Sequence, residues 1–123
     1  RDFITLRETI NANEARTAIE SKPRWIIIHK QQQKILMPAA DLARTLQELQ
    51  TEDKDAVADI DLLEIPAQRL QLAAIHMQAS LQEALEILNN SPAEALYVQR
   101  PSAPGIEHIY GILTRQKIES SYQ

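Results

Sequence analysis

The chain has 123 residues, of which 44% are hydrophobic and 24% charged, and only two are glycine. This length supports one compact unit, or two small halves that share a core. A net charge of −4 gives no basic footprint, so we do not expect nucleic acid as a partner. The chain has no cysteine, which excludes disulfides and thiolate catalysis.

No purely apolar stretch exceeds five residues, far below the roughly 18 needed to cross a bilayer. Nothing at the start of the chain resembles a signal peptide. We therefore expect a soluble segment with no direct insertion into a membrane.

The sequence reads as one pattern written twice. Residues 4 to 29 align with residues 73 to 98 at a constant offset of 69, which brings Asn11 onto Ser80. Both are good helix N-caps, and a glutamate three residues later completes the spacing of a capping box. Apolar residues then recur at the spacing of one helix face in both copies. The sequence therefore predicts a helix behind each cap.

A proline ends each of these helices, because proline disfavours helical geometry in the residue before it. The apolar runs WIII at 25 to 28 and ALYV at 95 to 98 follow, and they are typical of strands covered on both faces. Further along, the pattern predicts strands at 34 to 37 and 109 to 113 and helices at 39 to 50 and 115 to 121. Each half is then strand, helix, strand, turn, strand, helix.

A linker is expected between the halves. Residues 51 to 70 begin with the charged run TEDKD, and VADIDLLEI within them suggests an extended segment. In the second half the loop QRPSAPGIEH carries two prolines and a glycine, and beyond it the offset between the copies becomes 76. The acidic residues of the linker are interpreted as a solvated connector rather than as paired catalytic carboxylates.

This ordered duplication, whose last strand reads Gly-apolar-apolar-Thr into a helix, resembles the cystathionine-beta-synthase (CBS) domain pair over nearly the whole chain. The stretches LNNSPAEALYVQ and IYGILTRQKIESSYQ most resemble the cytoplasmic C-terminal region of bacterial chloride channels and transporters. The resemblance implies an α+β fold, with two β-α-β-β-α repeats packed through their sheets with pseudo-twofold symmetry. Residues 1–55 would hold the first repeat and the start of the linker, and 56–123 the rest of the linker and the second repeat.

The resemblance also implies a function. Such modules are regulatory rather than catalytic, often associate as homodimers, and can hold an adenine nucleotide such as AMP, ADP or ATP between the repeats. We therefore expect the soluble, cytoplasmic-side domain of a membrane anion channel or transporter, with the transporter domain in the same chain. The alternative is a structural dimerisation module whose ligand clefts are degenerate and empty.

The candidate ligand residues of the second repeat are Gly111, Thr114 and Lys117. A glycine lets a ligand approach the backbone, and a threonine N-cap offers a hydroxyl beside free helix amides, which suits phosphate. In the CBS family an aspartate that holds the ribose hydroxyls stands where this chain has Lys117. An ammonium has three donors and no acceptor, so it would prefer phosphate to a ribose diol.

The corresponding positions of the first repeat are Ile35, Pro38 and Asp41. This repeat keeps the carboxylate and loses the hydroxyl, and Pro38 has no amide hydrogen to offer a phosphate. A hybrid site that combines Asp41 with Thr114 is one interpretation. The alternatives are a plain N-cap at Thr114, compensation of the helix dipole by Asp41 and a solvated surface lysine at position 117.

Other residues give less support for a metal, ligand or catalytic site. The three histidines, His29, His76 and His108, lie far apart without metal-ligand spacing, so no metal site is expected. Trp25 and Tyr97 could stack on an adenine, but we interpret them as core or interface residues. No catalytic motif is present, and we do not expect an enzyme.

Overall fold

The computed structural model describes residues 2–51, 59–103 and 106–121. The chain divides into two compact units, Arg1–Arg69 and Leu70–Gln123. The predicted boundary between residues 55 and 56 lies outside the described residues. Residues 60 to 69, which were expected to form the last part of the linker, lie in the first unit.

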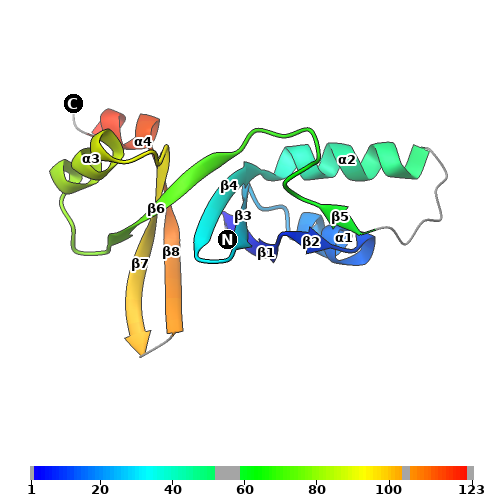
Figure 1. The fold of residues 1–123 in the computed structure, drawn as a ribbon, viewed down its shortest axis with the longest axis horizontal. Coiled ribbons are helices and arrows are strands. Elements are labelled where there is room, and N and C mark those ends of the chain that lie inside the picture. The colour runs from blue at the N-terminus through cyan, green and yellow to red at the C-terminus, as the bar shows by residue number, and fades with distance from the viewer. Residues whose placement is uncertain (1, 52–58, 104–105, 122–123) are drawn as a thin grey trace. The chain divides into compact units, whose positions relative to one another are not determined.

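Both units follow the predicted β-α-β-β-α order (Figure 1). The first unit contains β1 (Phe3–Arg7), β2 (Thr9–Ile10), α1 (Ala12–Glu20), β3 (Trp25–Lys30), β4 (Gln33–Pro38), α2 (Ala39–Thr51) and β5 (Ile60–Asp61). The second contains β6 (Leu70–His76), α3 (Leu81–Asn90), β7 (Ala95–Ala103), β8 (Ile106–Thr114) and α4 (Arg115–Ser121). The predicted α+β fold class is confirmed, and the first unit adds one short strand pair, β2 with β5.

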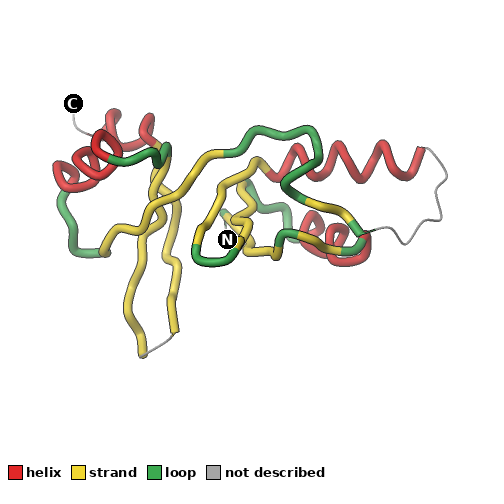
Figure 2. Tube along the Cα trace, viewed as in Figure 1, coloured by secondary structure: helices red, strands yellow, loops and turns green. Residues whose placement is uncertain are grey.

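Strand pairing is the same in the two units. In the first, β3 pairs in parallel with β1 and antiparallel with β4; in the second, β7 pairs in parallel with β6 and antiparallel with β8. Parallel neighbours need a crossover connection, which α1 and α3 supply, whereas antiparallel neighbours need only a turn. Figure 2 shows the β7–β8 hairpin as two long yellow segments.

The two predicted helix starts are confirmed. The amide of Glu14 donates to Asn11 Oδ1 at 2.8 Å, and the Asn11 amide donates back to Glu14 Oε1 at 3.5 Å, which completes a capping box. At the second start the amide of Glu83 donates to Ser80 Oγ at 3.1 Å. Each cap satisfies an otherwise orphaned donor and stabilises its helix by about 1 kcal/mol.

The constant offset of 69 between the repeats is wrong beyond these helices. Phe3 pairs with Trp25, and Leu72 pairs with Ala95, so the offset is 69 at the first strands and 70 at the middle strands. The extra residue lies in the helix, since α3 has 10 residues and α1 has 9. After α1 the chain turns through Lys22, whose φ of 52° is left-handed. No such left-handed residue follows α3 in the described chain.

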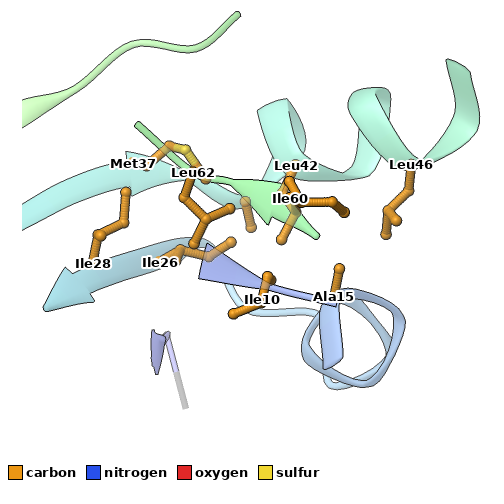
Figure 3. Close-up of a cluster of buried hydrophobic side chains, with 10 residues drawn as sticks. Ile10, Ala15, Ile26, Ile28, Met37, Leu42, Leu46, Ile60 and Leu62 are labelled. Atoms are coloured by element: carbon orange, nitrogen blue, oxygen red, sulfur yellow. The ribbon is translucent and has the colours of Figure 1, made fainter. Parts of the chain in front are cut away.

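The core of the first unit lies between its sheet and its two helices. Figure 3 shows the buried side chains converging from β2, β3, β4, β5, the turn after β5, α1 and α2, namely Ile10, Ala15, Ile26, Ile28, Met37, Leu42, Leu46, Ile60 and Leu62. Ile60 and Leu62 are 5% and 0% exposed, and burying such a side chain contributes about 1.5–3 kcal/mol. This burial explains why the end of the linker belongs to the first unit.

The second unit has a smaller core of its own. It contains the buried residues Ile75, Ala84, Leu88, Leu96 and Ile118. Tyr97 is buried as well, in line with its interpretation as a core residue.

Trp25, in the first unit, is half-buried. The guanidinium of Arg24 lies over its ring, 5.4 Å from the centroid.

Candidate functional site

Thr114 ends β8 and caps α4. The amide of Lys117 donates to Thr114 Oγ1 at 3.2 Å, which is the bond of an N-cap to the third helical residue. A threonine hydroxyl that accepts one bond still has an O–H to donate and a second lone pair. The capping role expected of Thr114 is therefore present, and it leaves the hydroxyl the capacity to donate to a phosphate oxygen.

The first turn of α4 differs in charge from the other helix starts. An acid occupies the first turn of α1, α2 and α3, whereas α4 has none there. Its first turn instead holds the exposed Lys117 and also Arg115, a residue that sequence reasoning missed. Arg115 donates to Asn89 Oδ1 at 3.2 Å and pairs with Glu119 at 3.7 Å. Cations at a helix N-terminus are unfavourable unless an anion is near.

Gly111 lies opposite Val98 in the β7–β8 ladder. The register shifts at this point, because Gln99 pairs with Ile109 and leaves Tyr110 as the extra residue of a β-bulge. A Cβ placed on Gly111 would meet no heavy atom within 4 Å. Packing therefore does not require glycine here, and the backbone has open space beside it.

Asp41 lies in the first turn of α2, and its carboxylate is engaged on both oxygens. Arg44 Nη2 donates to Oδ1 at 2.8 Å, and the backbone amide of Gln68 donates to Oδ2 at 3.0 Å. The Asp41 side chain is 14% exposed. Its carboxylate thus holds the end of the linker against α2, a long-range role that local sequence reasoning did not identify.

The register confirms how the two repeats correspond. Pro38 pairs with the first residue of β3 just as Thr114 pairs with the first residue of β7. Ile35 and Gly111 likewise occupy the same rung of their hairpins, opposite Ile28 and Val98. The offset of 76 predicted for the last strands is therefore correct, and Pro38 stands where the second repeat has its hydroxyl.

The structure brings Gly111, Thr114 and Lys117 together at the end of β8 and the start of α4. Asp41 belongs to the first unit. A site that combines Asp41 with these three residues stays a prediction.

Within the described residues, no group of three or more histidine, aspartate or glutamate side chains could hold a metal ion. His29 and His76 are exposed. In that same part of the chain, no helix combines the length and the hydropathy that a bilayer span requires.

No protein-family model matches the chain, and no curated protein matches it. Solved structures, in contrast, do match the chain. A CBS-domain-containing protein of unknown function from Kribbella flavida DSM 17836 is similar over 99% of this chain and 92% of its own, with a TM-score of 0.55 and 14% identity.

Two further solved structures have lower TM-scores. Staphylococcus aureus OpuCA has a TM-score of 0.46 and 12% identity, over 97% of this chain and 90% of its own. CBSX2 in complex with AMP has a TM-score of 0.46 and 17% identity, over 98% and 87%. The likeness to the Kribbella protein concerns architecture, and it agrees with the strand pairing within each unit: the chain has the fold of a CBS domain pair.

Proposed function

We propose that this chain is a regulatory, non-catalytic CBS pair that senses an adenine nucleotide, AMP, ADP or ATP. The observation that carries the proposal is the junction of β8 and α4, where the capping hydroxyl of Thr114 lies in a first turn with two cations and no acid. The CBS-like fold and the open space beside Gly111 support it.

The chemistry of the junction favours the phosphate end of a nucleotide. The hydroxyl of Thr114 and the first-turn amides other than that of Lys117 can donate hydrogen bonds to a phosphate, and Lys117 adds an ammonium with three donors. The ribose hydroxyls need an acceptor, and Asp41 of the first repeat is the candidate for that role. A nucleotide that binds one arrangement of the two repeats better than another would shift the module toward that arrangement.

The proposed setting is the cytoplasmic side of a membrane. The resemblance of residues 88–99 and 109–123 to the C-terminal region of bacterial chloride channels and transporters supports a transporter domain in the same chain. We propose that the module works as a homodimer in that setting, with nucleotide binding as the input and anion transport as the output.

Isothermal titration calorimetry with AMP, ADP and ATP tests the ligand. We expect saturable heat with at least one of them, and weaker binding of adenosine, which lacks the phosphate. Asp41→Asn should weaken binding, whereas Glu20→Gln, the same change of charge at an exposed acid on α1, should not. The absence of heat at millimolar nucleotide would remove the sensing function.

A second candidate is a structural interaction module with empty clefts. The engaged carboxylate of Asp41 favours it, since both oxygens already accept hydrogen bonds within the first unit. This candidate predicts the same dimer with and without nucleotide in sedimentation velocity experiments. It also predicts that Asp41→Asn changes stability alone.

A further inference from the structure

The end of the linker, residues 66–69, is tied to the start of α2; we call it the latch segment. Asp41 accepts the amide of Gln68 at 3.0 Å, and Arg44 Nη2 donates to the carbonyl of Pro66 at 3.2 Å. Arg44 also donates to Asp41 at 2.8 Å. These contacts form a small network, in which the Asp41 carboxylate accepts two bonds and the carbonyl of Pro66 accepts one.

This network already uses the Asp41 carboxylate, which is the group that the proposed function assigns to the ribose hydroxyls. A ribose diol donates two hydrogen bonds and needs accessible acceptor oxygens. Each oxygen of Asp41 already accepts one bond, and its side chain is only 14% exposed. Each oxygen keeps a second lone pair, but so little of the side chain is exposed that a diol approaching the carboxylate competes for it with the amide of Gln68 and the guanidinium of Arg44.

We infer that the latch segment is an autoinhibitory contact that competes with the ribose of a nucleotide for Asp41. The inference rests on the proposed function, because it assigns a regulation to the same site. Nucleotide binding at Asp41 then frees the amide of Gln68. Conversely, any contact that keeps the latch segment on α2 lowers the affinity for nucleotide, by the same coupling free energy.

The latch segment lies directly before the second unit in the chain. Arg69 ends the first unit, and Leu70 begins both the second unit and β6. Release of Gln68 therefore removes one backbone contact of the segment that leads into β6. The turn before it stays closed, because the guanidinium of Arg69 separately binds the carbonyls of Leu62 and Ile65.

Arg44→Ala is the first test, since it removes two contacts of the latch segment's network and leaves Asp41 in place. We expect the affinity for AMP to rise roughly three- to tenfold, the effect of one hydrogen bond. Arg16→Ala is the matched control, because it removes the same charge from an exposed arginine of α1 and should not raise the affinity. Gln68→Pro, which deletes the amide donor, should raise the affinity as Arg44→Ala does.

Amide hydrogen exchange measured by NMR gives the second readout. In the wild-type chain saturating AMP should speed exchange at Gln68, and Arg44→Ala should speed it without ligand. Binding of AMP with unchanged affinity in Arg44→Ala and a protected Gln68 amide would overturn the competition and leave the proposed function intact. Absence of AMP binding in the wild type and in both latch variants would overturn both.

Discussion

The guanidinium of Arg69 donates two hydrogen bonds to the carbonyl oxygen of Leu62, at 3.0 Å from Nε and 2.7 Å from Nη2. Nη2 also donates to the carbonyl of Ile65 at 2.6 Å, and Nη1 to that of Ala67 at 3.5 Å. One side chain thereby closes the turn that follows β5. Hydrogen bonds from a charged donor contribute more to stability than neutral ones do.

Arg69→Met should lower the free energy of unfolding by about 2 kcal/mol, because the carbonyls of the turn lose a charged donor. Arg69→Lys should recover only part of this loss, since an ammonium lacks the planar fork that serves several carbonyls at once. Urea unfolding followed by circular dichroism measures both. Arg16→Met, at an exposed position, is the control, and an equal loss in the control would contradict the role of Arg69.

Local signals in the sequence predict much of this fold. Asn11 and Ser80 start helices because an N-cap acts on amides only three residues away. The strands WIII and ALYV follow from unbroken apolar runs, and they form β3 and the start of β7. The correspondence of Pro38 with Thr114 is also local, because it depends on the register of a hairpin.

Features set by distant contacts could not be predicted in the same way. Asp41 and the amide of Gln68 are 27 residues apart, and no pattern along the chain links them. The burial of Leu62 in the first unit depends on a space that exists only once β3 and α2 have packed. A local signal for Arg44 did exist, because its spacing of three residues from Asp41 on a helix predicts an ion pair.

The difference of one residue between the repeats depends on how two helices end. Lys22 adopts a left-handed φ of 52° after α1, and its amide donates to the carbonyl of Ile19 at 2.9 Å. Proline follows Lys22 and restricts this residue further. A left-handed residue at this position is usually glycine. The backbone at Lys22 is therefore locally strained, and the sequence does not indicate this strain.

Lys22→Gly should therefore raise the free energy of unfolding by about 0.5–1 kcal/mol, because glycine adopts the left-handed conformation without a Cβ clash. Lys22→Ala removes the same side chain and charge without relieving the strain, so its stability should stay near that of the wild type. Thermal and urea unfolding of the pair give the comparison. The argument fails if alanine stabilises the chain as much as glycine does.

Gly111 offers a test that separates packing from ligand binding. Because a Cβ there would meet nothing within 4 Å, Gly111→Ala should leave the stability within about 0.5 kcal/mol of the wild type or raise it slightly. Under the proposed function the added methyl group should weaken AMP binding by filling the space beside the backbone. Unfolding and calorimetry on one variant measure both, and a large loss of stability would show that packing does require glycine.

The last prediction concerns Thr114, where the structural and the ligand roles overlap. Thr114→Ala removes the acceptor of the Lys117 amide and should cost about 1 kcal/mol of stability, whereas Thr114→Ser keeps the cap. Amide exchange at Lys117 should speed up in the alanine variant and not in the serine variant. Calorimetry then separates the roles: if the hydroxyl contacts phosphate, alanine weakens AMP more than adenosine and serine weakens neither. If alanine speeds exchange but leaves AMP binding unchanged, Thr114 is an N-cap alone, and the phosphate must bind elsewhere.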